Sequence, residues 1–155
     1  MANSDLPIEA ASNRDLKSLT ALWVDAFARF GYQAADFEKL FYDLSVRTDV
    51  VRLDQKVIGA VLSKRNHGAG EVLALLVHPM HRRRGLASRL LTDLLYRFRA
   101  GGVEFVRLHT AKDNLAAQGL FERHQFEARL DTVEYPHGQK AMLYERRFNP
   151  TSVDD

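Results

Sequence analysis

The segment that most constrains the fold runs from an apolar strand, through a basic loop, into an amphipathic helix. Residues 71–77 are almost continuously apolar, which is typical of a strand covered on both faces. An arginine triplet and Gly85 follow, and apolar residues then recur at helical spacing as far as Gly101 and Gly102. A second β-rich stretch covers residues 103–109. This order predicts a βαβ unit, in which a right-handed crossover makes the two strands parallel.

The rest of the chain shows helical and strand patterns in a regular order. The predicted elements are a strand at 7–11, a helix from a capping box at 12–15 to Gly31, a helix at 34–46, strands at 50–53 and 56–64 around an Asp54-Gln55 turn, a helix capped by Asp113 or Asn114, and strands at 128–135 and 140–148. The order is therefore β-αα-βββ-α-β-α-ββ. It predicts a mixed α/β (α+β) fold around a twisted, mostly antiparallel sheet with one parallel pair in the middle.

Length and composition indicate one globular domain. At about 150 residues per domain, the 155 residues form a single unit, expected over residues 1–148, with residues 149–155 as a flexible tail. Hydrophobic residues make up 46% and charged residues 27% of the chain, which excludes wholesale disorder. Cysteine is absent from the sequence, which excludes disulfide scaffolds, cysteine nucleophiles and cysteine-ligated metal sites, and we expect no metal cofactor.

Charge and hydropathy argue against nucleic-acid and membrane partners. The formal net charge is only +2, from 22 Lys and Arg against 20 Asp and Glu, which is too small an excess to indicate nucleic-acid binding. No apolar run approaches the roughly 18–20 residues that cross a bilayer. Residues 1–5 are polar and lack the features of a signal peptide, so we expect a cytoplasmic protein.

The loop before the third helix has the features of an anion site. A helix N-terminus carries about four N–H groups without intrahelical partners and roughly half a positive charge. Gly85 allows a tight turn and close approach of a ligand, and Ala87 keeps the first helical turn small. Arg82, Arg83 and Arg84 add positive charge. A phosphate or pyrophosphate is the expected ligand.

Other interpretations of this loop are weaker. The dinucleotide motif GxGxxG needs three glycines and the P-loop needs a Gly-Lys-Ser/Thr sequence, and neither occurs here. A solvated basic turn is the simplest alternative. Arginines at a helix N-terminus, however, oppose the helix dipole and cost a few tenths to about 1 kcal/mol unless an anion compensates them. Three of them at one helix start therefore favour a ligand.

Two segments of the chain carry motif-like patterns. One is the run Val77-His78-Pro79 followed by Arg82-Arg83-Arg84-Gly85-Leu86-Ala87, and the other is the run Asn114-Leu115-Ala116-Ala117 through Leu120-Phe121 to Phe126. Together they resemble the GNAT superfamily of N-acetyltransferases, with its acetyl-CoA motif Gln/Arg-x-x-Gly-x-Gly/Ala and its following segment Asn-x-x-Ala-x-x-Leu-Tyr and Gly-Phe. The predicted order of elements also matches the family fold along nearly the whole chain. This resemblance implies acetyl-CoA as a co-substrate.

The resemblance also implies where CoA would bind. Its pyrophosphate would lie on the backbone amides of residues 83–88, beside Arg82. The strand before the loop would carry a bulge and splay from the parallel strand, with pantetheine in the gap and one strand amide polarising the thioester carbonyl. The implied CoA-binding residues are Leu75, Leu76, Val77, Arg82, Arg83, Arg84, Gly85, Leu86, Ala87, Ser88, Asn114 and Phe121.

The implied reaction is direct attack of an amine on the acetyl thioester, so a base must take a proton from the ammonium. His109 is the first candidate for that base, because one family pattern places a carboxylate at the corresponding strand end and histidine titrates in a suitable range. Glu71 is the alternative, since some family members use a glutamate on the earlier strand, and it is expected to lie farther from the thioester. Phe121 stands where the family usually has a tyrosine acid, and it cannot donate a proton. Tyr144 and Tyr135 are the remaining candidate acids, although packed strand tyrosines are commoner.

In the family, the acceptor amine is recognised by the first two helices, their linker and the last hairpin. Tyr32 is expected to form a wall of that pocket and His137 to reach it, whereas Phe37 and Phe41 fit the core better. His124 is expected to be solvated. The acceptor would be a small-molecule or peptide amine, and the family resemblance makes a homodimer through the sheet edge a further expectation. Phe121 also keeps an alternative open, a CoA-binding sensor or partner module without turnover.

Overall fold

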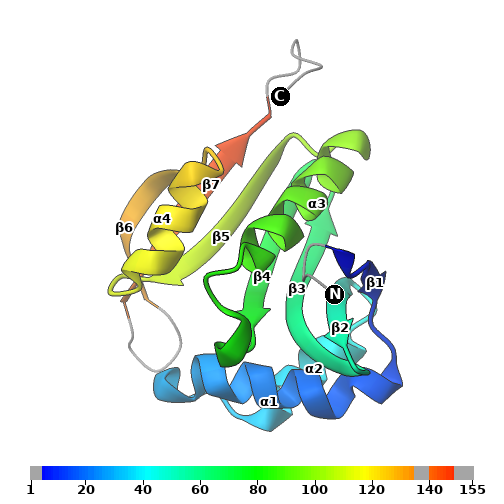
Figure 1. Cartoon of the computed structure of the whole chain (residues 1–155). Helices are drawn as coiled ribbons and strands as arrows, with labels where there is room; N and C mark the ends of the chain where they lie inside the picture. The colour runs from blue at the N-terminus through cyan, green and yellow to red at the C-terminus, as the bar shows by residue number, and fades with distance from the viewer. Residues whose placement is uncertain (1–4, 135–139, 149–155) are drawn as a thin grey trace.

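The computed structural model describes residues 5–134 and 140–148. Its strands form one sheet in the order β1-β2-β3-β4-β5-β7-β6, and helices lie on both faces (Figure 1). The strands are β1 (Ile8–Ala10), β2 (Val46–Leu53), β3 (Lys56–Asn66), β4 (Ala69–Val77), β5 (Phe105–Ala111), β6 (Glu127–Glu134) and β7 (Lys140–Arg147). The helices are α1 (Leu16–Phe27), α2 (Ala34–Tyr42), α3 (Leu86–Ala100) and α4 (Leu115–Arg123). This architecture confirms the predicted order of elements and the mixed sheet.

Alternating side chains of the central strands supply two apolar cores. On one face, Val61 and Val106 pack with the leucine stripe of α3 and with Phe121 of α4. On the other face, Leu62 packs with Trp23 of α1 and Phe37 of α2. Neighbouring residues Val61 and Leu62 thus enter different cores, as the two-residue period of a strand requires. No described helix has both the length and the apolar character needed to cross a bilayer.

The second helix is shorter than the sequence pattern predicted. It ends at Tyr42, and the predicted end at residue 46 is wrong because Val46 already pairs with Lys64 in the β2–β3 ladder. The Asp43 carboxylate accepts hydrogen bonds from the Ser45 backbone N–H (2.9 Å) and hydroxyl (2.7 Å), which stabilises a turn in place of further helix. Leu44 lies fully exposed in this turn, so an apolar residue at helical spacing misled the prediction.

The Asp54-Gln55 hairpin is confirmed. Both residues adopt left-handed backbone angles, with φ of 52° and 67°, as a two-residue hairpin turn demands. Strand β2 nevertheless begins four residues before the predicted start at residue 50. Residues 47–49 of this extension are polar and pair with β3, where Arg47 lies opposite Ser63.

The parallel pair β4–β5 is confirmed, and it is short. Its register runs from Ala69 opposite Phe105 to Val72 opposite Leu108 and stops there. At the same point β4 carries a bulge against β3, since Ser63 pairs with Val72 while Leu62 pairs with Ala74 and leaves Leu73 extra. Figure 1 shows the two strands diverging beyond this point. The bulge and the splay therefore occur together, at the C-terminal half of β4.

A tight C-terminal motif anchors α4 to β6. The Phe126 N–H donates to the Phe121 carbonyl (3.0 Å) and the Gln125 N–H to the Glu122 carbonyl (3.1 Å), which is the hydrogen-bond pattern of a Schellman motif. The rings of Phe121 and Phe126 pack edge to face, with centroids 6.0 Å apart. Gln125 holds the left-handed position of this motif at φ 62°, where glycine is the favoured residue.

Replacing Gln125 with glycine is therefore expected to raise the free energy of unfolding. The left-handed conformation costs a non-glycine residue about 1 kcal/mol, and glycine removes that cost without changing either hydrogen bond. Chemical denaturation should show a higher midpoint at an unchanged m-value. Gln125→Ala is the matched control, because it shortens the side chain but keeps the strain. Equal stability of Gln125→Gly and the parent chain would contradict the assignment.

Candidate functional site

A cavity of about 780 Å³ opens where β4 and β5 diverge. Its walls come from α1 and α2 on one side, from the two strands at its base, and from α4 on the other side. The lining residues are Trp23, Ala26, Phe27, Arg29, Phe30, Tyr32, Asp36, Lys39, Leu40, Glu71, Val72, Leu73, Ala74, Leu75, Arg107, Leu108, His109, Thr110, Ala111, Asn114, Ala117, Phe121 and Leu143. The cavity therefore joins the predicted pantetheine gap to the predicted acceptor side.

The backbone of β4 presents polar groups to this gap. His78 N–H donates to the Ile58 carbonyl of β3 (2.8 Å), and the antiparallel register alternates from there. Leu76 consequently turns its main-chain groups toward β3, while Leu75 and Val77 turn theirs toward the side from which β5 has separated. Of the three residues implied by the family resemblance, Leu75 and Val77 can bind a ligand through the main chain. Leu76 instead contributes to the α1–α2 core.

The loop between β4 and α3 folds into a turn that ends at the helix N-terminus. Arg83 and Gly85 both take left-handed backbone angles, with φ of 63° and 77°. Gly85 is the N-cap of α3, and a Cβ built on it would meet no atom within 4 Å. The amides of Leu86, Ala87 and Ser88 open the helix, where backbone N–H groups have no intrahelical acceptor. This open space over a helix start fits the pyrophosphate that the sequence predicted.

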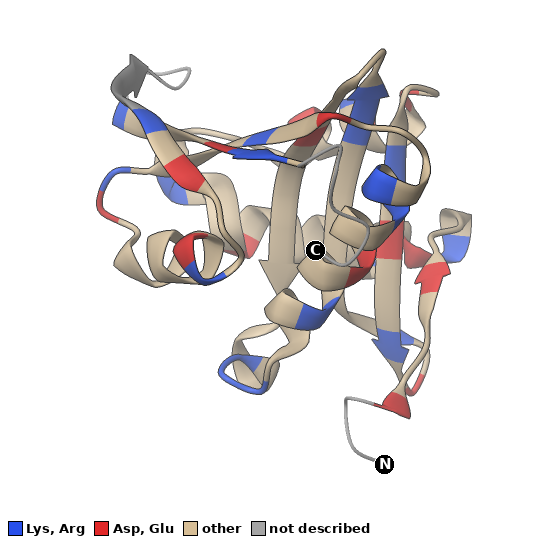
Figure 2. Ribbon diagram, turned by 90° about the horizontal axis from the view of Figure 1, so that it is seen from above, with Lys and Arg blue, Asp and Glu red and all other residues tan. Residues whose placement is uncertain are grey.

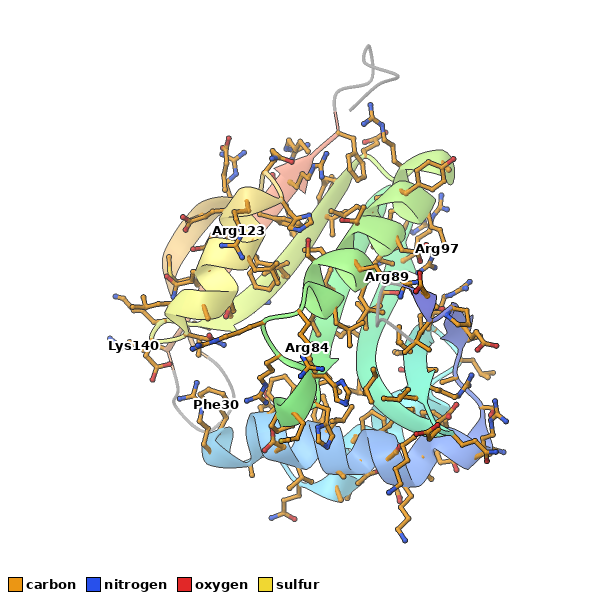
Figure 3. The ribbon with its side chains drawn as sticks, viewed as in Figure 1. Phe30, Arg84, Arg89, Arg97, Arg123 and Lys140 are labelled. Atoms are coloured by element: carbon orange, nitrogen blue, oxygen red, sulfur yellow. The ribbon has the colours of Figure 1, made fainter. Side chains whose placement is uncertain are left out.

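The arginines of the loop have different roles. Arg82 donates to the Asp25 carboxylate of α1 (2.8 Å) and to the Val77 carbonyl (3.3 Å), so it ties the loop to α1 and to the strand end. Arg84 lies beside the start of α3 (Figure 3). Burial, the positive charge of Arg84 and neighbouring His78 together lower the pKa of His81. Figure 2 shows both charge signs along the ribbon, so this positive region is local.

Ser88 links the start of α3 to the end of α4. Its hydroxyl lies 2.8 Å from Nε2 of His124 in a hydrogen bond. Burial, with Arg146 and Arg123 nearby, lowers the pKa of His124. The expectation that His124 is solvated is therefore wrong. The helical pattern could not show this contact, since the two residues are 36 positions apart in the chain.

Asn114 and Phe121 place α4 against the cavity. The Asn114 side-chain oxygen accepts the Ala117 N–H (3.2 Å) and caps α4, which leaves the amide NH₂ group to meet a ligand. The Phe121 ring is nearly buried, stacks beside Tyr144 with centroids 6.1 Å apart, and closes the cavity wall with carbon atoms only.

His109 and Glu71 lie on adjacent strands and line the same cavity. Glu71 pairs in register with Arg107, two residues before His109 on the same face of β5. Burial in the cavity wall lowers the pKa of His109 below its ordinary value of 6.5, and the Glu71 carboxylate partly opposes this effect. A lowered pKa favours the neutral imidazole of His109 near pH 7, and the neutral form is the one that accepts a proton.

Tyr144 does not line the cavity. It is 1% exposed, belongs to the α3–α4 core, and donates its hydroxyl to the Glu122 carboxylate (3.1 Å). Burial and this hydrogen bond raise the pKa of Tyr144. The structure thus separates Tyr144 from His109 and Glu71, although all three were candidates for proton transfer. Tyr135 and His137 lie outside the described residues.

Trp23 and Thr110 are among the cavity residues that sequence reasoning missed. Trp23 belongs to the apolar stripe of α1, which predicts only a core position, yet it also lines the cavity. Thr110 is 6% exposed and lines the cavity next to the predicted His109. Tyr32 lines the cavity as predicted, and Phe37 is fully buried as predicted. No local sequence signal distinguishes a helix stripe that only packs from one that also lines a pocket.

Comparison with known proteins shows which family the chain matches. Residues 16–126 match the model of the Acetyltransferase (GNAT) family. An acetyltransferase of Pectobacterium atrosepticum is 28% identical over 137 residues, which cover 86% of this chain and 94% of that protein.

Two solved structures share the fold. The PaiA N-acetyltransferase of Thermoplasma acidophilum, in complex with coenzyme A, matches with a TM-score of 0.75 and 16% identity over 93% of this chain and 99% of that one. The ribosomal-protein-S18-alanine N-acetyltransferase of Escherichia coli matches with a TM-score of 0.78 and 17% identity over 96% and 97%. With the family model spanning both motifs and the cavity between them, the chain belongs to the GNAT acetyltransferase family.

Proposed function

We propose that this protein transfers the acetyl group of acetyl-CoA to a primary amine by direct attack in a ternary complex. The observation that carries the proposal is the splay of β4 from β5 beyond Val72, which opens a cavity lined on one side by aromatic residues of α1 and its linker. The basic loop and the start of α3 follow β4 directly in the chain, so a long thiol ester with a pyrophosphate at one end suits this arrangement. The PaiA relative was solved with coenzyme A, which supports the choice of substrate.

In the proposed complex the chain binds acetyl-CoA mainly through its backbone. The pyrophosphate lies on the amides that open α3, next to Arg82 and Arg84. Pantetheine follows β4, where the main-chain groups of Leu75 and Val77 face the gap. One of these amides donates to the thioester carbonyl and stabilises the oxyanion that forms on attack. Loss of one such donor in an acyl-transfer enzyme costs about 2.7–4 kcal/mol of transition-state stabilisation.

A residue that lines the cavity then accepts a proton from the substrate. His109 takes a proton from the bound ammonium, and the neutral amine forms a C–N bond to the carbonyl carbon. The nitrogen of the tetrahedral intermediate gives its second proton to water, the C–S bond breaks, and the thiolate of CoA leaves. Because Phe121 offers no proton and Tyr144 is bound to Glu122, neither of these two described residues protonates the thiolate, which takes a proton from water. A thiol pKa of about 8.5 makes that departure feasible.

Replacing Gly85 with valine is expected to weaken CoA binding at least tenfold, which is about 1.4 kcal/mol. The φ of 77° strains any β-branched residue, and the added side chain occupies the open space over the helix start. Calorimetric titration with CoA at moderate salt gives the dissociation constant.

Gly102→Val is the matched control for that experiment. Gly102 has a φ of 86° and follows the opposite end of α3, so the substitution brings similar backbone strain far from the loop. Its CoA affinity should equal that of the parent chain. Unchanged CoA affinity in folded Gly85→Val protein would contradict the proposal that the pyrophosphate binds at this loop.

The replacement of the usual tyrosine by Phe121 also fits a second function, a CoA-binding sensor without turnover. Release of free thiol from acetyl-CoA over a panel of amines separates the two. Amine-dependent thiol release supports the transferase. CoA binding without release for any amine supports the sensor.

A further inference from the structure

We propose that the acceptor is a primary amine carried on an aromatic group, with no second cationic group. This inference rests on the proposed function and names the substrate class of the same site. It comes from the half of the cavity that α1, α2 and their linker form. Aromatic side chains gather there, and cationic side chains lie beside them.

Four aromatic side chains form a continuous group on this side of the cavity. We call Trp23, Phe27, Phe30 and Tyr32 the ring cluster, and all four line the cavity. Ring centroids are 4.5 Å apart for Trp23 and Phe27, 5.9 Å for Trp23 and Tyr32, and 6.0 Å for Phe27 and Tyr32. The last two pairs meet edge to face, which is a favourable aromatic geometry and fixes the orientation of each ring.

Such a cluster is suited to a flat apolar ligand. Aromatic walls stabilise an inserted ring by burial and by edge-to-face contact, with about 0.5–1.5 kcal/mol for each ring pair beyond the burial itself. The Trp23 indole N–H is buried and has no hydrogen-bond acceptor among the described residues, whereas buried donors in native proteins are usually satisfied, so this N–H can donate to a ligand or a water in the cavity. Burial and Asp36 raise the pKa of Tyr32, so its phenol adds no negative charge near neutral pH.

Charges around the cluster disfavour a second cation on the acceptor. Arg29 lies with its guanidinium 4.3 Å from the Phe30 ring centroid and forms an exposed pair with Asp113 at 3.4 Å, so a cation already occupies that aromatic face. Lys39 adds a second positive charge to the wall. Asp36 accepts the Gln33 N–H (2.6 Å) as part of the α2 cap, which reduces its capacity to bind a ligand ammonium. A diamine would place its second ammonium near Arg29 and Lys39.

The base of the cavity is suited to the reacting amine. Glu71 and His109 lie on the strands that form this base and line the same cavity as the ring cluster. The Glu71 carboxylate attracts one ammonium, and the His109 imidazole can take its proton. One cation at the base and one aromatic group at the ring cluster therefore describe the acceptor.

The experiment compares three amines, n-butylamine, 1,4-diaminobutane and 2-phenylethylamine, in acetyl-CoA-dependent thiol release. We expect kcat/KM for 2-phenylethylamine to exceed that for n-butylamine at least tenfold, and 1,4-diaminobutane to be the poorest of the three. A kcat/KM for 1,4-diaminobutane equal to or above that for 2-phenylethylamine would overturn the proposal.

A second measurement keeps this inference separate from the proposed function. Trp23 is the only tryptophan in the chain, so its fluorescence reports directly on the ring cluster. In the presence of CoA, 2-phenylethylamine should change the emission in a saturable way, and n-butylamine should need at least a tenfold higher concentration. Saturable binding without thiol release would uphold the acceptor class and reject the transferase. Equal half-saturation for the two amines would reject the acceptor class even if both are acetylated.

Variants of Tyr32 test the cluster with little risk to folding, because Tyr32 lies in the linker between α1 and α2. Tyr32→Ala should reduce the preference for 2-phenylethylamine over n-butylamine at least threefold with CoA affinity unchanged, and Tyr32→Phe should retain it. Tyr96→Ala is the control, because Tyr96 is 74% exposed on α3 and does not line the cavity. A preference unaffected by Tyr32→Ala would contradict the role of the ring cluster.

Discussion

Replacing His109 with alanine is expected to lower kcat by about 100-fold or more while the dissociation constant of CoA stays unchanged. A positioned general base contributes typically 10²–10⁴-fold to a rate, and His109 is the proposed base and lines the cavity. In the proposed complex CoA binds through the helix start and the β4 backbone, which the substitution does not touch. Steady-state kinetics with a saturating amine and calorimetry with CoA give the two quantities.

The pH dependence of kcat tests the same role of His109 as a base. Burial lowers the pKa of His109 below 6.5, so the active neutral form predominates at a lower pH than for an ordinary histidine. The acid limb of the kcat profile should therefore lie below pH 6.5 and be absent from His109→Ala. Glu71 raises the pKa of His109, so Glu71→Gln should shift the limb to still lower pH while activity persists.

Glu71→Gln is also the control for the identity of the base. If Glu71→Gln abolishes turnover while His109→Ala retains the parent kcat and pH profile, Glu71 is the base and His109 is not. If both variants retain the parent profile, neither residue takes the proton.

Replacing Asp15 with alanine is expected to lower the free energy of unfolding by about 3–5 kcal/mol, the cost of breaking a buried ion pair by removing one partner. The Asp15 side chain is fully buried and accepts two hydrogen bonds from Arg52, from Nε (2.8 Å) and Nη2 (2.7 Å). It also accepts the Ser12 N–H (2.8 Å) in the capping box that precedes α1. Alanine leaves the 10%-exposed Arg52 without its principal carboxylate.

Chemical denaturation at neutral pH measures this loss. Asp113→Ala is the matched control, because Asp113 pairs with Arg29 at 3.4 Å with both side chains more than half exposed, and such pairs contribute less than about 1 kcal/mol. A loss in Asp15→Ala no larger than in Asp113→Ala would contradict the argument.

The contribution of Asp15 should also depend on pH. Its hydrogen bonds with Arg52 lower the pKa of Asp15 below the ordinary value of 3.8. The native state thus releases the proton more readily than the unfolded chain, and the stabilisation is complete above pH 3.8. It is lost as the pH falls below 3.8 through the pKa of the folded state. The stability difference between the parent chain and Asp15→Ala should shrink over that range.

Features that depend on neighbours in the chain could be predicted from the sequence. The apolar run of β4, the arginine triplet, Gly85 and the stripe of α3 follow one another directly, and the loop has the predicted place and shape. The Asp54-Gln55 turn and the Ser12–Asp15 capping box are likewise local, since each is formed by residues within one turn. The family motifs belong to this class too, which is why Asn114 and Phe121 line the cavity as expected.

Features that depend on contacts between residues far apart in the chain could not be predicted from the sequence. Strand 140–147 contains both Tyr144 and Leu143, and only the pairing with β5 shows that Leu143 faces the cavity while Tyr144 faces Glu122. The α1 stripe gave no sign that Trp23 lines a pocket as well as packing in the core. The end of α2 depended on the β2–β3 ladder, and the Asp15–Arg52 pair joins residues 37 positions apart.

The sequence by itself determined the order of the elements, the basic loop with Gly85 at the start of α3, and the candidates for proton transfer. Tertiary structure alone decided which candidates line the same cavity, which main-chain groups of β4 face the gap, and that aromatic side chains of α1 and its linker line one side of that cavity. The physical reason is the two-residue period of strands. One extra residue at Leu73 reverses the alternation and ends the β4–β5 pairing, and no local pattern records where such a bulge falls.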